Sequence, residues 1–363
     1  MNNKQKIYFF SEKNVEGNKD MFSLLGGKGA NIAEMCSLKL PVPPGFTITT
    51  EECVSYLKEK KLSPALKRDI EKNIKKVESV SGKLFGGDDP LLLSVRSGAP
   101  VSMPGMMETV LNIGLTQKTI PLLIKKTKNE KFVYDSYRRF IMMYSDVVME
   151  KGLRKNKTGQ PIRDQMEKLL DQMKKKNGYK NDSAVSSESW EGLAKQYLGL
   201  YEKTFNEQFP EDHTEQLLGA VRAVFSSWNG KRAKEYRAFE KIPSKMGTAV
   251  NVQAMVFGNM GTGCGTGVAF TRNPSSGDKS FYGEWLENAQ GEDVVAGVRT
   301  PHPILKKDGS KNSLEHVLPK AFKELNTIRT KLEKHFMDMQ DIEFTVENKK
   351  LWMLQTRRGK RTG

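Results

Sequence analysis

The feature that most constrains the fold is a pair of alternating segments near the end of the chain, at residues 342–347 and 351–356. Successive side chains of a strand point to opposite faces of the sheet. Five apolar residues share one parity, and the polar residues Asp341, Glu343, Gln355 and Arg357 share the other. The pattern therefore predicts a β-hairpin with one face on a core and one polar face. The apolar set is Ile342, Phe344, Val346, Trp352 and Leu354.

The polar face of this hairpin gathers two carboxylates, an amide and a guanidinium. If Asn348-Lys349-Lys350 forms a three-residue turn, Glu343 lies opposite Gln355, and Asp341 lies opposite Arg357. Paired carboxylates suit Mg²⁺, which commonly takes one or two of them together with substrate phosphates. A guanidinium can bind phosphate through two parallel hydrogen bonds. An exposed polar face with ordinary cross-strand pairs explains the pattern equally well.

A glycine-rich segment at 258–267 connects two apolar segments that are predicted to be strands, at 249–257 and 267–271. Glycine lets backbone amides come close to a phosphate. The segment is not a Walker A loop, because no Gly-Lys-Ser/Thr follows, and no helical pattern follows to make it a Rossmann turn. A flexible hairpin loop is the alternative interpretation.

Two single cations stand at the ends of predicted elements. Lys28 lies in a glycine turn at a helix start, where backbone amides and the helix dipole favour anions. Arg96 ends a buried strand predicted at 91–96. Each of them can equally be a solvated charge. The four histidines stand in unrelated contexts without a catalytic setting: His213, His302, His316 and His335.

Length and charge limit the remaining possibilities. A chain of 363 residues is expected to form two or three subdomains. The net charge of +16 fits either a polyanion partner or a lysine-rich solvated surface, and the lack of aromatics between the lysines favours the surface. No apolar run approaches the roughly 20 residues of a membrane span. The three cysteines form no CxxC pair, and the first residues lack a secretory signal. We expect no nucleic acid, no membrane and a cytoplasmic location.

The order of predicted elements mixes strands and helices. A strand is expected at 7–10, and helical patterns occupy 51–80 and 318–338. Between 116 and 208 the chain is rich in lysine and glutamate with spaced apolar residues, which predicts a mostly helical insert.

Several motifs in register resemble the pyruvate, phosphate dikinase family, and the similarity covers essentially the whole chain. They stand in the order of that family, and long motifs in register are far more specific than any one of them. The motifs are Gly26-Gly27-Lys28-Gly29-Ala30-Asn31, Ser94-Val95-Arg96-Ser97-Gly98-Ala99, Met103-Pro104-Gly105-Met106-Met107-Glu108-Thr109, Glu287-Asn288-Ala289-Gln290-Gly291-Glu292-Asp293-Val294-Val295, Gln340-Asp341-Ile342-Glu343-Phe344 and Leu354-Gln355-Thr356-Arg357.

The resemblance implies an α+β chain with an ATP-grasp fold of two lobes and a helical insert subdomain. Residues 1–115 would form the first lobe, completed by about 209–245, and residues 116–208 would form the insert. Residues 246–357 would form the second lobe. Residues 358–363 would begin a linker to a phosphohistidine domain that the chain lacks.

The resemblance also implies roles for individual residues. Lys28, Arg96 and Arg357 would be the catalytic cations that act on the phosphates. Asp341 and Glu343 would hold Mg²⁺, the cofactor that accompanies the substrate ATP. Adenine would lie along 253–256. The residues implied to bind the nucleotide are Lys28, Arg96, Gly105, Met107, Gln253, Met255, Gly261, Gly263, Gly265, Glu343 and Gln355.

The family converts ATP, inorganic phosphate and pyruvate to AMP, pyrophosphate and phosphoenolpyruvate. A histidine on a swivelling domain of the same chain carries the phosphoryl group, and the full-length protein is expected to be a homodimer. This sequence ends at Gly363 without a histidine in that setting. We therefore expect it to bind nucleotide, and not to turn over pyruvate by itself.

Two other interpretations stay open from the sequence. One is the nucleotide domain of a phosphoenolpyruvate synthase, a related dikinase that uses water in place of phosphate. The run from Ser97 to Met107 resembles the phosphate-using branch more closely. The other is a non-catalytic module that binds a nucleotide or a polyanion, which the positive charge would suit.

Overall fold

A computed structural model of the chain describes residues 5–153, 156, 159–295, 297, 299–306 and 310–359. The chain divides into two compact units. The first unit comprises Met1–Phe9, Met21–Gly29 and Gly45–Met255, and the second comprises Phe10–Asp20, Ala30–Pro44 and Val256–Gly363. Most of the expected linker, 360–363, lies outside the described residues.

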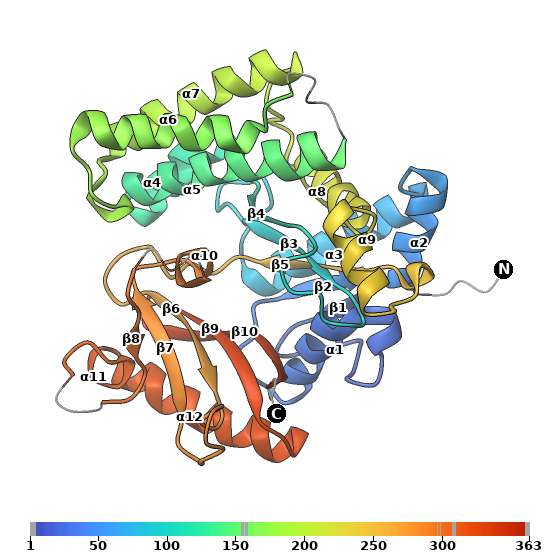
Figure 1. Ribbon diagram of the computed structural model, residues 1–363, viewed down its shortest axis with the longest axis vertical. Coiled ribbons are helices and arrows are strands. Elements are labelled where there is room, and N and C mark those ends of the chain that lie inside the picture. Colours follow the sequence, from blue (N-terminus) through green and yellow to red (C-terminus); the bar gives the residue numbers. More distant parts are fainter. Residues whose placement is uncertain are drawn as a thin grey trace. The chain divides into compact units, whose positions relative to one another are not determined.

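The first unit is built on a five-stranded sheet with the order β1-β2-β5-β3-β4 (Figure 1). Its central strand β5 pairs antiparallel with both β2 and β3, and β3 pairs antiparallel with β4. Valines and isoleucine on one face of these strands are buried, as the apolar patterns predict. The strands are β1 Ile7–Phe10, β2 Gly45–Ile48, β3 Leu93–Gly98, β4 Thr109–Ile113 and β5 Ala249–Ala254.

Helices supply the rest of the first unit, and the stretch expected at 116–208 is helical as predicted. It contains α4 Thr119–Thr127, α5 Glu130–Met143, the π-helix Tyr144–Gly152, α6 Ile162–Asn177, a short 3₁₀ turn Asp182–Ala184 and α7 Ser187–Phe205. The other helices of the unit are α2 Thr50–Glu59, α3 Pro64–Ser81, α8 His213–Ser227, α9 Lys231–Phe239 and the 3₁₀ turn Ser244–Met246.

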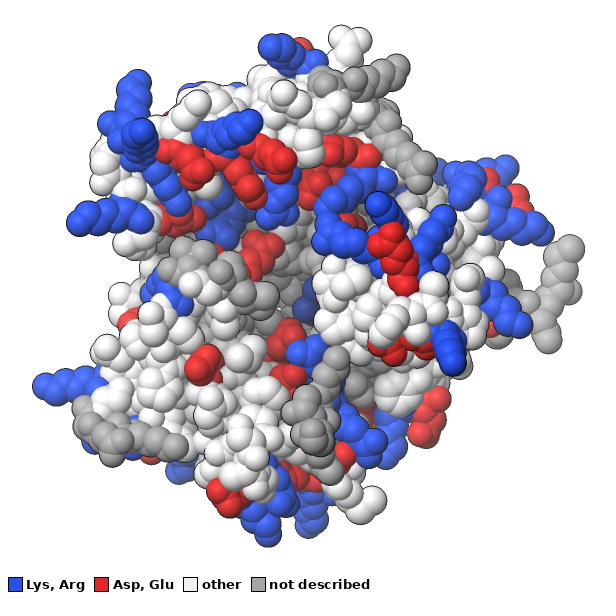
Figure 2. Space-filling model, viewed as in Figure 1, with Lys and Arg blue, Asp and Glu red and all other residues white. Residues whose placement is uncertain are grey.

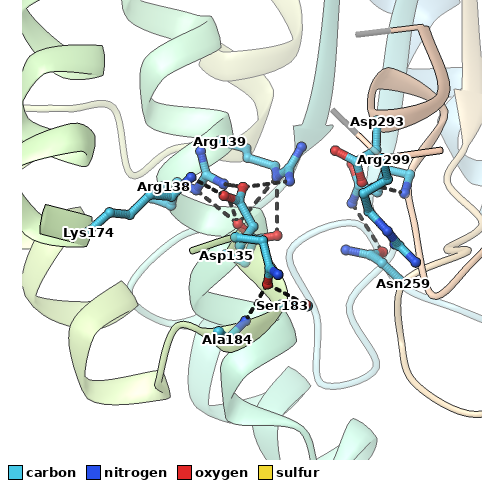
Figure 3. A network of polar contacts seen from close by, with 12 residues as sticks. Asp135, Arg138, Arg139, Lys174, Ser183, Ala184, Asn259, Asp293 and Arg299 are labelled. Carbon is cyan, nitrogen blue, oxygen red and sulfur yellow. Dashed lines mark hydrogen bonds and ion pairs between the residues drawn. The ribbon is translucent and has the colours of Figure 1, made fainter. Parts of the chain in front are cut away.

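An ion-pair network around the buried Arg138 holds the helical stretch together (Figure 3). The guanidinium of Arg138 donates to Asp135 at 2.7 Å and to Asp182 at 2.8 Å, and it stacks over the ring of Trp190 at 4.4 Å. Lys174 pairs with Asp182 as well. Burial opposes the charge of Asp182, but Arg138 and Lys174 outweigh it and hold the pKa of this carboxyl below its usual range.

The second unit is built on another five-stranded sheet, with the order β10-β9-β6-β7-β8 (Figure 1). One face packs on α12 and on the end of α1 (Phe22–Ser37) through a single apolar cluster that includes Trp285, Phe344, Met353 and Leu332. Its elements are β6 Gly265–Phe270, β7 Tyr282–Glu287, α10 Gly291–Val295, β8 His302–Pro303, α11 Leu314–Val317, α12 Pro319–Phe336, β9 Gln340–Glu347 and β10 Lys350–Arg358.

The unit boundaries differ in two places from the expected lobe boundaries. Strand β5 falls in the expected second lobe, 246–357, yet it is the central strand of the first sheet. Conversely, 10–20 and 30–44 belong to the second unit, where Ile32 and Met35 join its core. Strand β5 belongs to the first sheet because it pairs with β2 and β3, although it follows the helical stretch in the chain.

The described surface carries both basic and acidic side chains. On the face shown in Figure 2, acidic side chains lie among the basic ones over the helical stretch α4–α7. Among the described residues, no helix is long and apolar enough to cross a membrane.

Candidate functional site

A row of polar side chains crosses one face of the first sheet. Residues that lie opposite each other on paired strands share a face. Thr47 lies opposite Asn251, Asn251 opposite Arg96, and Arg96 opposite Thr109. Gln253, two residues along β5, is on the same face. The predicted residues Arg96 and Gln253 are therefore neighbours on one face.

Hydrogen bonds fix the direction of these polar groups. Arg96 donates from Nη2 to Oε1 of Gln253, and Thr47 donates from Oγ1 to Oδ1 of Asn251 at 2.8 Å. Asn251 is fully buried, and among the described residues its Nδ2 has no hydrogen-bond partner. Buried donors of this kind are costly unless a ligand or water satisfies them. The face therefore offers a guanidinium and amides to a polar ligand.

Close backbone contacts place Lys28 beside this face. Helix α1, Phe22–Ser37, is interrupted at Gly26, where φ is 66° and ψ is 168°. A Cβ at Gly26 would lie 1.6 Å from the carbonyl oxygen of Gly98, so only glycine fits there. The amide of Gly27 donates to the carbonyl of Ala99 at 2.9 Å. These contacts dock the predicted glycine turn on the end of β3.

Two glycines flank Asn251 in the same way. A Cβ at Gly29 would lie 3.0 Å from Oδ1 of Asn251, and a Cβ at Gly98 would lie 2.7 Å from its Nδ2. The Cβ at Gly98 would also lie 3.3 Å from the Cβ of Lys28. The glycines of the Gly26-Gly27-Lys28-Gly29 motif thus bring Lys28 against the strand that carries Arg96.

Three other predicted residues of the first unit lie at its loops. Gly105 has φ of 70° with open space where a side chain would stand, and Met107 is half-buried in the same loop. Met255 follows β5, and its amide donates to the carbonyl of Leu92 at 2.8 Å. No contact in the structure tests their predicted roles toward a nucleotide.

The hairpin β9–β10 carries the polar face of the second sheet. Gln355 lies opposite Glu343 and Arg357 lies opposite Asp341, as the sequence predicts. Arg357 donates from Nε to Oδ2 of Asp341 at 2.6 Å. Gln355 is buried, whereas Asp341, Glu343 and Arg357 are half-buried. The two carboxylates and the guanidinium therefore share one partly accessible face.

The predicted turn and the predicted core residues of β10 are wrong, whereas the predicted core residues of β9 and the site pairs are right. Asn348 and Lys349 form a two-residue turn, both with positive φ, and Lys350 already pairs with Glu347. A bulge at Leu354 then restores the predicted pairing. Because the bulge reverses the parity of β10, Leu351 and Met353 fill the core, and Trp352 is on the polar face opposite Thr345.

The glycine segment is less open than the sequence suggests. Gly265 and Gly267 belong to β6, where a Cβ would collide with the rings of Trp285 and Phe344 at 2.7 and 2.6 Å. Packing therefore explains both glycines. Gly263 has φ of 80° and accepts from the amide of Lys349 at 2.8 Å. Gly261 has φ of 123° with open space around it, so it is the loop glycine best placed for a close ligand.

The metal ligands predicted from the sequence fit Mg²⁺ with an anionic substrate. Among the described residues, no group of three or more His, Cys, Asp or Glu side chains is arranged to hold a metal ion. Asp341 and Glu343 supply two hard oxygen ligands on one strand face. Mg²⁺ demands six oxygens and usually completes its shell with water and substrate phosphates. The donor set suits a metal that arrives with a phosphorylated ligand.

Sequence reasoning did not single out Thr47, Asn251 or Asn288 as site residues. The signal for Asn251 is present, because Asn251 and Gln253 alternate with Val250, Val252 and Ala254 along one strand. A polar residue on every second position predicts a polar face. Thr47 and Asn288 act through partners distant in sequence, at Asn251 and Gly261, and no local pattern announces such contacts.

Comparison with known proteins identifies the family of this chain. The family model described as pyruvate phosphate dikinase, AMP/ATP-binding domain, matches residues 22–83, 62–321 and 306–363. The chain therefore belongs to the AMP/ATP-binding domain family of pyruvate phosphate dikinases. This confirms the family that the motifs resemble.

Three relatives show how much of a longer protein the chain represents. It is 51% identical over 350 residues to pyruvate, phosphate dikinase of Clostridium symbiosum, covering 96% of this chain and 38% of that protein. For the dikinase of Rhizobium meliloti (strain 1021), the values are 49% identity, 98% and 39%. For the chloroplastic dikinase 1 of Arabidopsis thaliana they are 48%, 99% and 36%. The chain thus spans less than two fifths of the length of these relatives.

Proposed function

We propose that the chain binds Mg·ATP and supplies the nucleotide-binding part of a pyruvate, phosphate dikinase. The observation that carries the proposal is the chemistry of the two polar faces. One face presents Arg96 and Gln253 with Lys28 beside them, and the other presents Asp341 and Glu343 with Arg357. Cations and amides suit phosphates, and carboxylates suit Mg²⁺.

Each residue has a definite part in this proposal. Lys28 and Arg96 neutralise phosphate oxygens, and Asp341 and Glu343 hold the Mg²⁺ that travels with the nucleotide. When the ligand binds, Arg357 exchanges its ion pair with Asp341 for a contact with a phosphate. The bound Mg²⁺ supplies charge neutralisation at the phosphates. Gly105 in the first unit and Gly261 in the second both have positive φ with open space where a side chain would stand, which lets the backbone of each loop approach a phosphate.

The finer parts of the proposal concern the longer protein. We infer an ATP-grasp fold, which the family of the chain supports. The names of the relatives support inorganic phosphate and pyruvate as further substrates. From the family resemblance we also propose a swivelling phosphohistidine domain as the phosphoryl acceptor and a homodimer. A cytoplasmic location is supported by the three free cysteines. The phosphohistidine domain would supply the histidine that accepts the phosphoryl group, because none of the four histidines of this chain is on either polar face.

Calorimetric titration with ATP tests the proposal directly. We expect saturable binding of one ATP per chain in the presence of Mg²⁺, and binding weaker by at least tenfold when EDTA removes the metal. A polyanion-binding module would instead respond to salt and ignore the metal. Binding that falls with salt and is the same with Mg²⁺ and with EDTA contradicts the proposal.

The variant Asp341→Asn has a matched control two residues before the same hairpin. Asp338 is equally buried and pairs with Arg358 of β10 at 2.5 Å, much as Asp341 pairs with Arg357. Asp338→Asn therefore removes a comparable charge and ion pair outside the polar face. We expect the metal requirement to survive in Asp338→Asn and to be lost in Asp341→Asn.

A further inference from the structure

The segment 288–290 runs along the glycine loop of the second unit and holds it at both ends. The amide of Ala289 donates to the carbonyl of Gly258 at 2.9 Å, and the amide of Asn288 donates to the carbonyl of Cys264 at 2.9 Å. The side chain of Gln290 donates to Asn259 at 3.2 Å, a residue labelled in Figure 3. The two ends of the loop are thereby fixed to one short segment.

Asn288 itself has an unusual and well-supported backbone. Its φ is 49°, in the left-handed region that asparagine tolerates better than other residues with a side chain. The guanidinium of Arg299 donates to the carbonyl of Asn288 at 3.2 Å and to that of Glu287 at 2.9 Å. These two bonds hold the segment in the conformation that turns the Asn288 side chain toward the loop.

The side chain of Asn288 reaches the apex of the loop. Its Oδ1 accepts a hydrogen bond from the amide of Gly261 at 3.1 Å. Gly261 is the loop residue with φ of 123° and open space around it. The backbone bonds described above fix the ends of the loop, whereas this side-chain bond fixes the apex.

We propose that Asn288 is a positioning residue for polyphosphate binding, which orders the glycine loop before the nucleotide arrives. The inference rests on the proposed function, because it requires the loop to contact the β- and γ-phosphates. A loop already held in one conformation loses less entropy when the ligand binds. Asn288 therefore raises the affinity for the phosphate tail, while the rest of the nucleotide is unaffected.

The variant Asn288→Gly tests this role without disturbing the backbone, because glycine accepts positive φ readily. Asn348→Gly is its matched control. Asn348 also has φ of 49°, is exposed, and contacts Cys264, but it does not bond to Gly261. Affinities for Mg·ATP and for AMP are measured by calorimetry in the wild type and in both variants.

We expect Asn288→Gly to weaken Mg·ATP by about 2- to 12-fold, the range for one hydrogen bond, and to leave AMP unchanged. The ratio of the two affinities then falls by the same factor, whereas Asn348→Gly keeps the wild-type ratio. An unchanged ratio in Asn288→Gly, or an equal loss for both ligands, overturns the inference. A merely structural role would lower both affinities together.

Hydrogen exchange separates failure of this inference from failure of the proposed function. The Gly261 amide should exchange faster in Asn288→Gly than in the wild type and in Asn348→Gly, with no ligand present. Unchanged exchange means that Asn288 does not hold the apex, whatever the nucleotide affinity. If the wild type fails to bind Mg·ATP at all, the proposed function falls, and the phosphate role of Asn288 falls with it.

Discussion

The two sheets of the molecule have the same number of strands but differ in the charge of their polar faces. Each has five strands and one apolar face in a core. The other face of the first sheet carries a guanidinium among amides and hydroxyls, whereas that of the second carries two carboxylates with a guanidinium paired to one of them. Under the proposed function, this difference would be a division of labour, in which the first face binds phosphate and the second binds the metal.

The two faces also differ in how they are built. In the first unit, tight glycine contacts bring a helix start against a strand end, and a single substituted Cβ at Gly26 would strike the Gly98 carbonyl. In the second unit, a hairpin with a bulge sets the register of the site pairs. One site depends on close backbone approach, and the other depends on strand parity.

The largest effect is expected at the arginines, when the phosphohistidine domain of a relative is joined to the chain. Arg96→Ala and Arg357→Ala should slow phosphoryl transfer from ATP to the histidine by about 10³-fold, because such cations stabilise charge in the transition state. Transfer of label from ATP to the histidine measures the rate. Arg163→Ala, which removes an exposed helical charge paired with Glu167, is the control. Equal losses in binding and transfer would show uniform ground-state contacts instead.

The next effect distinguishes the metal face from its surroundings. Asp341→Asn and Glu343→Gln should each weaken Mg·ATP by at least about 100-fold, since even residues that only support a metal ligand commonly cost 10- to 100-fold. Calorimetry in millimolar Mg²⁺ measures the loss, and circular dichroism checks the fold. Wild-type affinity in both variants would show that the carboxylates do not hold the metal.

Ligand binding should also stabilise the folded chain. At a concentration of Mg·ATP one hundred times its dissociation constant, we expect a gain of about 2.7 kcal/mol in the free energy of unfolding. Thermal denaturation with and without ligand measures it, with Mg²⁺ alone as the control. A melting temperature that Mg·ATP leaves unchanged would contradict binding at either face.

Which features of the two faces could be predicted from the sequence depends on whether the deciding contacts are local or between distant segments. The site pairs of the hairpin follow from alternation, and the helical stretch 116–208 follows from its spacing. The two-residue turn at Asn348 and Lys349 and the bulge at Leu354 were not predicted. Each shifts the strand register by one residue, and the two shifts cancel, so the site pairs are unchanged. The sequence therefore predicted the strand partners of Gln355 and Arg357 correctly, but placed Trp352 on the wrong face.

Contacts between distant segments explain the remaining differences. The partner strands β2 and β3 place β5 in the first sheet, and nothing in residues 249–254 specifies those partners. Gly265 and Gly267 appeared to belong to a phosphate loop, because the ring packing of Trp285 and Phe344 is invisible in the local pattern. In both cases the decisive neighbour is far away in the chain.

The smallest effect concerns a charge network of the first unit outside its polar face. The folded-state pKa of Asp182 is held below its ordinary value by Arg138 and Lys174, against the effect of burial. The stability from this carboxylate is therefore present above its ordinary pKa and is lost as pH falls through the lowered value. Because Asp182 is about one third exposed, we expect no more than about 1 kcal/mol.

Acid titration of unfolding in Asp182→Asn measures this contribution. Below pH 4, the free energy of unfolding should fall less steeply with decreasing pH in the variant than in the wild type. The affinity of the variant for Mg·ATP at pH 7 should equal that of the wild type. A fall in nucleotide affinity would mean that the helical network belongs to the site, and the comparison of the two faces would then be incomplete.

The most direct test of the division of labour is the Mg²⁺ dependence of ATP affinity, measured by calorimetry in three proteins over a range of Mg²⁺ concentrations. The wild type should bind ATP more tightly as Mg²⁺ rises. Arg96→Ala should bind more weakly at every concentration but keep the same dependence on Mg²⁺. The double variant Asp341→Asn with Glu343→Gln should lose that dependence. If Arg96→Ala loses the Mg²⁺ dependence and the carboxylate variant keeps it, the assignment of the two faces is wrong.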